Sequence, residues 1–205
     1  MAGRRTIAAL LIAAFLRIAG ASHHGPAQPP GTARIHIRLV DLAELPGKIR
    51  AAAEGMAADV FRRSGIEIDF IECLTTPGSP CREPGGQADF WLQILKQRPD
   101  HLHRDSAGFA ILVRSDRSGD SYAAVSYPMV AAAARNLEAP VAEVLGASLA
   151  HELGHLVLHS SAHSRVGIMS PRLDRRQIRA LERGELLFTA DETARLRKRA
   201  AQLAP

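Results

Sequence analysis

A histidine pair with a glutamate beside it interrupts the most apolar helical segment of the chain. Residues 140–159 are rich in Val, Leu and Ala, and the letters HELGH stand at residues 151–155. The apolar residues predict a buried helix. Because four residues make just over one helical turn, His151 and His155 project from the same face. Burying such polar groups without partners is costly, and a shared metal ion removes that cost.

Two imidazoles one turn apart with an adjacent glutamate are typical of the zinc sites of hydrolytic enzymes. Zinc accepts imidazole nitrogen at about 2.0–2.1 Å, and three protein ligands leave a position open for water. Glu152 stands beside the histidines, where it can take a proton from that water. We therefore expect Zn²⁺ as the cofactor, His151 and His155 as ligands, and Glu152 as general base.

Two further histidines compete for the place of the third ligand. At a rise of 1.5 Å per residue, His159 lies roughly 12 Å along the helix axis from His151, too far to share one ion easily. His163 lies beyond the expected helix end, where the chain can turn back. This geometry favours His163, and His159 remains the alternative. A downstream carboxylate, Glu182 or Glu185, would instead give a gluzincin-like site, although both residues fall in an amphipathic region typical of surface charges.

The HExxH motif, a later histidine and the letters GIM at residues 167–169 resemble the metzincin peptidases, whose Met-turn passes beneath the metal. The segment is also similar to exported bacterial proteins with an HExGHLLLG…HSxxGIM pattern. The resemblance implies a zincin-like α+β domain with a twisted mixed sheet, an active-site helix and a small helical C-terminal lobe. It also implies the zinc ligands His151, His155 and His163, the general base Glu152 and the Met-turn methionine Met169.

The spacing differs from that of metzincins in two respects. Eight residues separate His155 from His163, where metzincins have six. The glycine with which metzincins leave the helix is replaced by Leu158, and the glycine of the closer bacterial pattern is replaced by His159. The resemblance alone therefore does not predict the shape of the turn that must return His163 to the metal.

The first 21 residues have the pattern of a secretory signal peptide. Two arginines precede an apolar stretch, and the small residues 19–21 follow it as a cleavage site. We expect residues 22–33 to form a flexible leader and residues 34–205 the metallopeptidase domain, secreted or periplasmic. Without residues 1–21 the formal charge falls from +5 to +2, which gives little reason to expect a nucleic-acid partner. The apolar stretch is too short for a membrane span and is interrupted by Arg17, so we expect no stable membrane span after cleavage.

An exported chain meets oxidising conditions, so its two cysteines predict a disulfide. Cys73 and Cys81 flank a short segment rich in Pro and Gly that can bring the sulfur atoms together.

Alternating apolar residues predict strands at 35–42 and 66–70, joined by a helix that begins at Pro46 and ends at residues 64–65. A strand–helix–strand unit of this length implies parallel strands. Further strands are expected at 90–95 and 109–113.

The segment 121–127 predicts a weaker strand, at a sheet edge. Capping-box pairs, Asp174 with Gln177 and Thr189 with Glu192, predict the starts of two C-terminal helices.

These features favour a peptidase that acts on peptides or proteins, with the edge strand at 121–127 aligning an extended substrate. Two alternatives share the metal site. One is a catalytically silent, zinc-stabilised binding module, although such a module has no need of Glu152. The other is a zinc hydrolase of a non-peptide amide.

Overall fold

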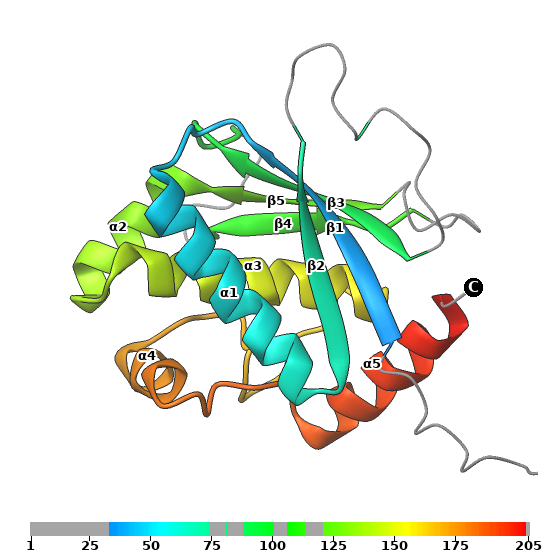
Figure 1. Cartoon of the computed structure of the whole chain (residues 1–205). Coiled ribbons are helices and arrows are strands. Elements are labelled where there is room, and N and C mark those ends of the chain that lie inside the picture. The colour runs from blue at the N-terminus through cyan, green and yellow to red at the C-terminus, as the bar shows by residue number, and fades with distance from the viewer. Residues whose placement is uncertain (1–32, 74–80, 82–87, 101–105, 114–120, 204–205) are drawn as a thin grey trace, which may run out of the picture. The chain divides into compact units, whose positions relative to one another are not determined.

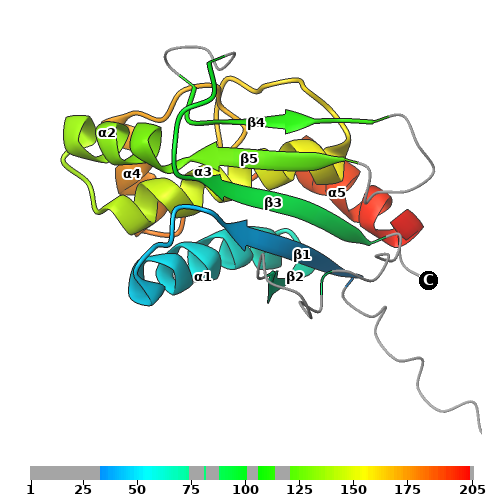
Figure 2. The ribbon, with the colours of Figure 1, turned by 90° about the horizontal axis from the view of Figure 1, so that it is seen from above.

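The chain folds into an α+β arrangement with a five-stranded mixed sheet and five helices among its described residues. The strand order is β2-β1-β3-β5-β4, and the helices lie on one side of the sheet (Figure 1; Figure 2). The expected fold class is therefore confirmed. The predicted signal peptide and nearly all of the predicted leader lie outside the described residues. The computed structural model describes residues 33–73, 81, 88–100, 106–113 and 121–203.

Strands β1 (Ala33–Asp41) and β2 (Ile66–Glu72) pair in parallel, as the strand–helix–strand pattern predicts. Helix α1 (Gly47–Arg63) connects them. The alternating apolar side chains of β1 are buried under α1 and its neighbours. The helix ends where Gly65 adopts a φ of +79°, a left-handed conformation that glycine takes without steric cost. Local sequence thus determines this whole unit.

The other half of the sheet differs from expectation in one respect. Strand β3 (Asp89–Leu95) pairs in parallel with β1 and with β5 (Tyr122–Ser126), and β4 (Gly108–Ile111) pairs antiparallel with β5. The prediction that segment 121–127 is an edge strand is wrong, because β5 lies between β3 and β4. The small side chains of residues 123–125 are buried there, and β4 forms the edge instead.

Helix α2 (Tyr127–Leu137) was not expected, and it begins where the predicted strand was thought to end. Pro128 stands in its first turn, where the fixed φ of proline suits a helix and no hydrogen bond is lost. The helix ends at Glu138, which adopts a φ of +55°. It packs against the helix that follows.

Helix α3 (Val141–Leu158) confirms the predicted core helix. It lies beside α1 beneath the sheet (Figure 1). Its length and hydropathy would allow it to cross a membrane, but 67% of it is buried inside the protein. Such burial is typical of a core helix, which explains its apolar composition.

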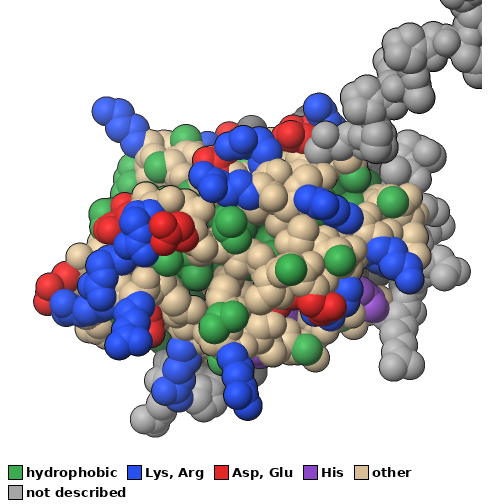
Figure 3. Space-filling model, turned by 90° about the horizontal axis from the view of Figure 1, so that it is seen from below, with side chains coloured by type: hydrophobic (Ala, Val, Ile, Leu, Met, Phe, Trp, Pro, Cys, Tyr) green, Lys and Arg blue, Asp and Glu red, His purple; other side chains and the backbone are tan. Residues whose placement is uncertain are grey.

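The last two helices, α4 (Arg175–Glu182) and α5 (Ala190–Leu203), form the helical C-terminal part. Both predicted capping boxes are present: Asp174 accepts from the backbone at the start of α4, and Glu192 pairs with Thr189 at the start of α5. Seen from below in Figure 3, Lys and Arg side chains are spread over this face with Asp and Glu among them. Hydrophobic side chains form only small, separate areas there.

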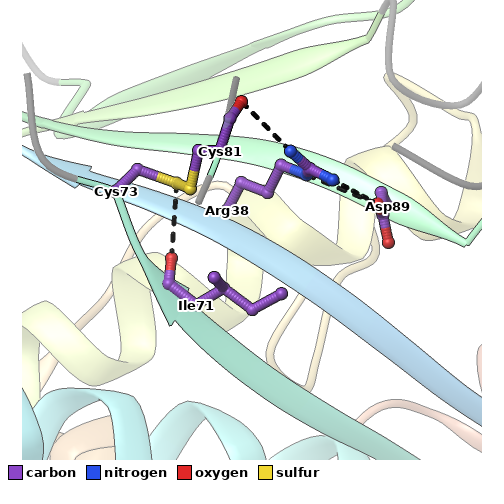
Figure 4. The surroundings of a disulfide bond; sticks show 5 residues. All are labelled: Arg38, Ile71, Cys73, Cys81 and Asp89. Atoms are coloured by element: carbon purple, nitrogen blue, oxygen red, sulfur yellow. Dashed lines mark hydrogen bonds and ion pairs between the residues drawn. A yellow bond between two sulfur atoms is a disulfide. The ribbon is translucent and has the colours of Figure 1, made fainter. Parts of the chain in front are cut away.

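The predicted disulfide between Cys73 and Cys81 is present, with the two Cα atoms 5.5 Å apart. It joins the residue after β2 to the segment that precedes β3. Figure 4 shows Arg38 of β1 holding this link: its Nη1 donates to the carbonyl of Cys81 at 3.1 Å, and its Nη2 pairs with Asp89 at 2.9 Å. The pair is buried, so each charge has its partner where an unpaired charge would be costly.

Candidate metal centre

Helix α3 places the histidines of the HExxH motif on one side, one turn apart. The Nε2 atoms of His151 and His155 are 3.1 Å apart. His155 is buried and His151 half-buried. Both rings therefore point to one small region at the surface of the core.

The chain leaves α3 at His159, where the similar bacterial pattern has glycine. His159 adopts a φ of +48°, a left-handed conformation that histidine tolerates better than most residues. The backbone N–H of Ser160 then donates to the carbonyl of His155 at 3.1 Å, the bond that closes a Schellman turn. The side chain of His159 is exposed and does not join the histidine cluster. His159 thus supplies the turn and not the third ring.

The loop after this turn brings His163 back to the helix. Its Nε2 lies 3.2 Å from that of His151 and 3.3 Å from that of His155. His163 itself is exposed. The structure therefore brings together the three histidines that the sequence analysis singled out, His151, His155 and His163.

The spacing of the three rings fits a tetrahedral cation. With metal–nitrogen bonds of about 2.0–2.1 Å, two ligand atoms on a tetrahedron are separated by about 3.3–3.4 Å. The observed Nε2 separations of 3.1, 3.2 and 3.3 Å are close to that edge length. The three atoms would hold a tetrahedral cation from one side and would leave its fourth position for water or substrate.

Hydrogen bonds on the far side of two rings fix which nitrogen faces the centre. His151 Nδ1 lies 2.8 Å from the carbonyl oxygen of Ile168, and His155 Nδ1 lies 2.6 Å from that of Ser160. A carbonyl only accepts, so in the neutral ring each Nδ1 carries the hydrogen and each Nε2 a lone pair. Lone pairs this close repel one another unless a cation lies between them. The donor set therefore fits a metal ion.

The surroundings keep the rings in the neutral form that binds metal. Burial lowers the pKa of His151 to about 4, against the opposing effects of the hydrogen bond to Ile168 and the negative charge of Glu192. Burial also lowers the pKa of His155. At neutral pH a cation would thus meet little competition from protons at these two ligands.

The carboxyl group of Glu152 is buried beside the cluster and faces strand β4. A Cβ atom at Gly108 would lie 2.7 Å from Glu152 Oε1, so glycine leaves the space that this carboxyl group occupies. Burial raises the pKa of Glu152 to about 8. A group that titrates near neutral pH is suited to taking and returning a proton.

The predicted Met-turn residue Met169 is fully buried next to α3. The turn is held by backbone bonds: Ser164 donates to the carbonyl of Met169 at 2.9 Å, and Ile168 donates to that of Leu187 at 2.9 Å. Gly167 has a φ of +79°, which favours glycine at this position. Met169 therefore packs against α3 at Gly154, which lies between His151 and His155 in the sequence.

A cavity of about 680 Å³ opens beside the cluster, a size typical of ligand sites. It lies between α3, β4 and the chain that follows the Met-turn. Its walls are mostly apolar, with the polar side chains of Ser148, Arg172 and Gln177 among them. Four members of the site line the cavity as well: His151, Glu152, His155 and His163.

The remaining alternatives for the third ligand lie elsewhere. Glu182 is exposed, and Glu185 is exposed and pairs with Arg183 at 2.7 Å. Gly108 was not predicted as part of the site, because its only signal is a glycine at the start of a strand. Glu192 was predicted as a helix cap alone, although it hydrogen-bonds Ser164, the residue after His163.

The fold is similar to two solved metallopeptidase structures. Archaemetzincin from Methanopyrus kandleri superposes with a TM-score of 0.52 at 18% identity, over 84% of this chain and 98% of that one. Metalloproteinase-II from Bacteroides fragilis gives a TM-score of 0.51 at 12% identity, over 85% of this chain and 55% of that one. At these identities the likeness establishes a metallopeptidase-like fold. No protein-family model and no curated protein sequence matches the chain.

Proposed function

We propose that the protein is an exported zinc-dependent metallopeptidase, with His151, His155 and His163 as zinc ligands and Glu152 as general base. One observation carries the proposal: three Nε2 atoms form a tetrahedral face 3.1–3.3 Å on edge, beside a buried carboxyl group and a cavity. The metallopeptidase-like fold supports it. When bound, zinc supplies a Lewis acid that polarises the peptide carbonyl and lowers the pKa of the attacking water.

The side chains of this chain supply the proton transfers. Glu152 faces the cavity from α3, so its carboxylate can accept a proton from the water that attacks the scissile carbonyl. The resulting carboxylic acid then donates that proton to the leaving amine. Burial raises the pKa of Glu152 to about 8, so the protonated carboxyl group is favoured near neutral pH and can serve as the acid.

Strand β4 provides the means to hold an extended substrate. It is an edge strand in the described sheet, paired on one side with β5, and Gly108, Phe109 and Ala110 line the cavity. An extended peptide can add to such an edge through backbone hydrogen bonds. Recognition of this kind reads the main chain, so it favours a peptide over a non-peptide amide and an internal bond over a terminal one.

The buried carboxyl group argues against a silent zinc module. Glu152 is buried without a hydrogen-bond partner among the described residues, an arrangement that destabilises the fold. A structural zinc site does not need a carboxyl group beside the metal ligands, whereas a hydrolytic site requires one as general base.

Export is supported by the N-terminal pattern of residues 1–21 and by the Cys73–Cys81 disulfide, which is typical of oxidising compartments. Cell fractionation and N-terminal sequencing of the recovered protein test it. A chain that starts near residue 22 outside the cytoplasm is the expected result.

The test of the activity compares wild type with Glu152→Gln on a library of unstructured peptides, with zinc measured in both. We expect internal cleavage by the wild type and at least a hundredfold slower cleavage by Glu152→Gln at the same zinc content. Equal rates would contradict the mechanism. Stoichiometric zinc without cleavage by the wild type would favour the silent module, or a non-peptide amide as substrate.

A further inference from the structure

The carboxylate of Glu192 lies in the first turn of α5, and its residue is only 2% exposed. Its two oxygens have different partners. Oε1 accepts from the hydroxyl of Ser164, and Oε2 accepts from the backbone N–H of Thr189 at 2.8 Å. One side chain thus joins the C-terminal helix to the loop of His163.

No cation of the protein neutralises this carboxylate within the described part of the chain. None of the ion pairs there includes Glu192. A buried charge without an opposite charge is costly, and the N-terminus of α5 offsets only part of that cost. The nearby cluster of three histidines is where a dication would bring the missing positive charge.

Of the three histidines, His163 is the one whose ring is not fixed by a hydrogen bond from Nδ1 to the backbone among the described residues. The Nδ1 atoms of His151 and His155 are each tied to a backbone carbonyl, but among the described residues no hydrogen bond holds Nδ1 of His163. The ring is exposed and sits on a loop. Its position therefore depends on how the backbone beside it is held.

Ser164 directly follows His163, and its hydrogen bonds fix the backbone next to that histidine. Its N–H donates to the carbonyl of Met169 at 2.9 Å, and its hydroxyl donates to Glu192. The loop is thereby fixed on one side to the Met-turn and on the other to α5.

We propose that Glu192 is a positioning residue of the metal centre: through Ser164 it holds the loop of His163, and its buried charge balances the cation. This inference rests on the proposed zinc site. Glu192 touches neither metal nor substrate in this account. The simpler reading is that Glu192 only caps α5, so the test must separate the cap from the contact with Ser164.

Four substitutions make that separation. Ser164→Ala removes the hydroxyl that reaches Glu192 and leaves the cap intact. Thr189→Ala removes the Oγ1 that accepts the backbone N–H of Glu192 at 3.3 Å and leaves the bond to Ser164 intact. Glu192→Ala removes both, and Glu192→Gln removes the charge at nearly constant size.

The readouts are zinc affinity, by competition with a chromophoric chelator, the visible spectrum of the cobalt-substituted protein, and the melting temperature of the metal-free protein. We expect Ser164→Ala and Glu192→Ala to weaken zinc binding by about 10- to 100-fold and to alter the cobalt spectrum. Glu192→Gln should also weaken binding. Thr189→Ala should lower the melting temperature and leave affinity within about threefold of wild type.

Zinc affinity and cobalt spectrum unchanged in both Ser164→Ala and Glu192→Ala would overturn the positioning role while leaving the peptidase proposal in place. If Glu192→Ala does not fold, Ser164→Ala decides the matter alone, because it keeps the cap. A wild type that binds no zinc would overturn the metal site and this role together. Because none of these readouts is peptide cleavage, absent cleavage by a zinc-loaded wild type would count only against the peptidase.

Discussion

The sulfur of Met169 lies against the bare backbone of Gly154, in the space that a side chain at position 154 would occupy. The ring of Phe188 closes the same space, with its Cε1 2.9 Å from where a Cβ atom would be. Gly154 stands between the two histidines of the HExxH motif on α3. The absence of a side chain there therefore lets Met169 pack directly against α3 between the two histidines of the motif.

Substitution of this glycine should separate the Met-turn from the helix. Gly154→Ala adds a methyl group that overlaps the Met169 sulfur, and such overpacking costs about 1–3 kcal/mol of the free energy of unfolding. Urea denaturation of the metal-free protein measures the loss.

The matched control is Gly55→Ala in α1. Gly55 is also inside a helix, but nothing lies within 4 Å of a Cβ atom added there. Alanine at that site should stabilise the protein by about 0.5–1 kcal/mol, because it favours the helix. If Gly154→Ala and Gly55→Ala changed the free energy of unfolding equally, the close contact at Gly154 would make no contribution to stability.

The metal-free protein should be most stable near pH 6.5. Its buried His151 has a folded-state pKa of about 4 against an ordinary 6.5, so between those values the unfolded chain binds the proton and the folded one does not. The contribution of His151 to stability is therefore lost as the pH drops through that window. His155, whose pKa burial also lowers, acts in the same direction.

Glu152 acts in the opposite sense. Its pKa is raised from 4.5 to about 8, so between those values the folded protein keeps a proton that the unfolded chain has lost. Above pH 6.5 the contribution of the histidines to the free energy of unfolding no longer changes with pH. The free energy of unfolding should therefore decline as the pH rises to 8. Thermal melts in the presence of a chelator test this, and Glu152→Gln should abolish the decline above pH 6.5. A decline that persists in Glu152→Gln would assign it to another group.

Loss of the disulfide should affect stability and leave the metal centre intact. Replacing Cys73 and Cys81 together by alanine frees a short loop in the unfolded state and should lower the free energy of unfolding by about 2–3 kcal/mol. Zinc content should stay unchanged, because the cysteines are not part of the histidine cluster. A double variant that lost zinc would show a coupling between the disulfide and the site that the contacts do not reveal.

Local sequence predicted those parts of the fold that depend on local physics. The alternation in β1, the cap residues of α4 and α5, and the apolar composition of α3 each follow from interactions within a few residues. The HExxH spacing on a helix likewise places two rings on one face. These predictions are confirmed as structure.

Features that depend on distant contacts could not be predicted in the same way. The small residues of β5 read as a weak edge strand, but whether a strand is central depends on its neighbours, and β4 turned out to be the edge. The return of His163 depends on His159 adopting a left-handed conformation without glycine. Glu192 carried a visible capping signal, and its bond to Ser164 spans 28 residues of sequence.

The most direct measurement is the zinc content of the purified protein beside His163→Ala and His159→Ala, prepared identically. The account predicts about one zinc per chain in the wild type, its loss in His163→Ala, and its retention in His159→Ala, because only His163 completes the tetrahedral face. Retention of zinc by His163→Ala with loss in His159→Ala would contradict the assignment of the third ligand. A wild type without zinc, even after reconstitution, would contradict the central claim itself.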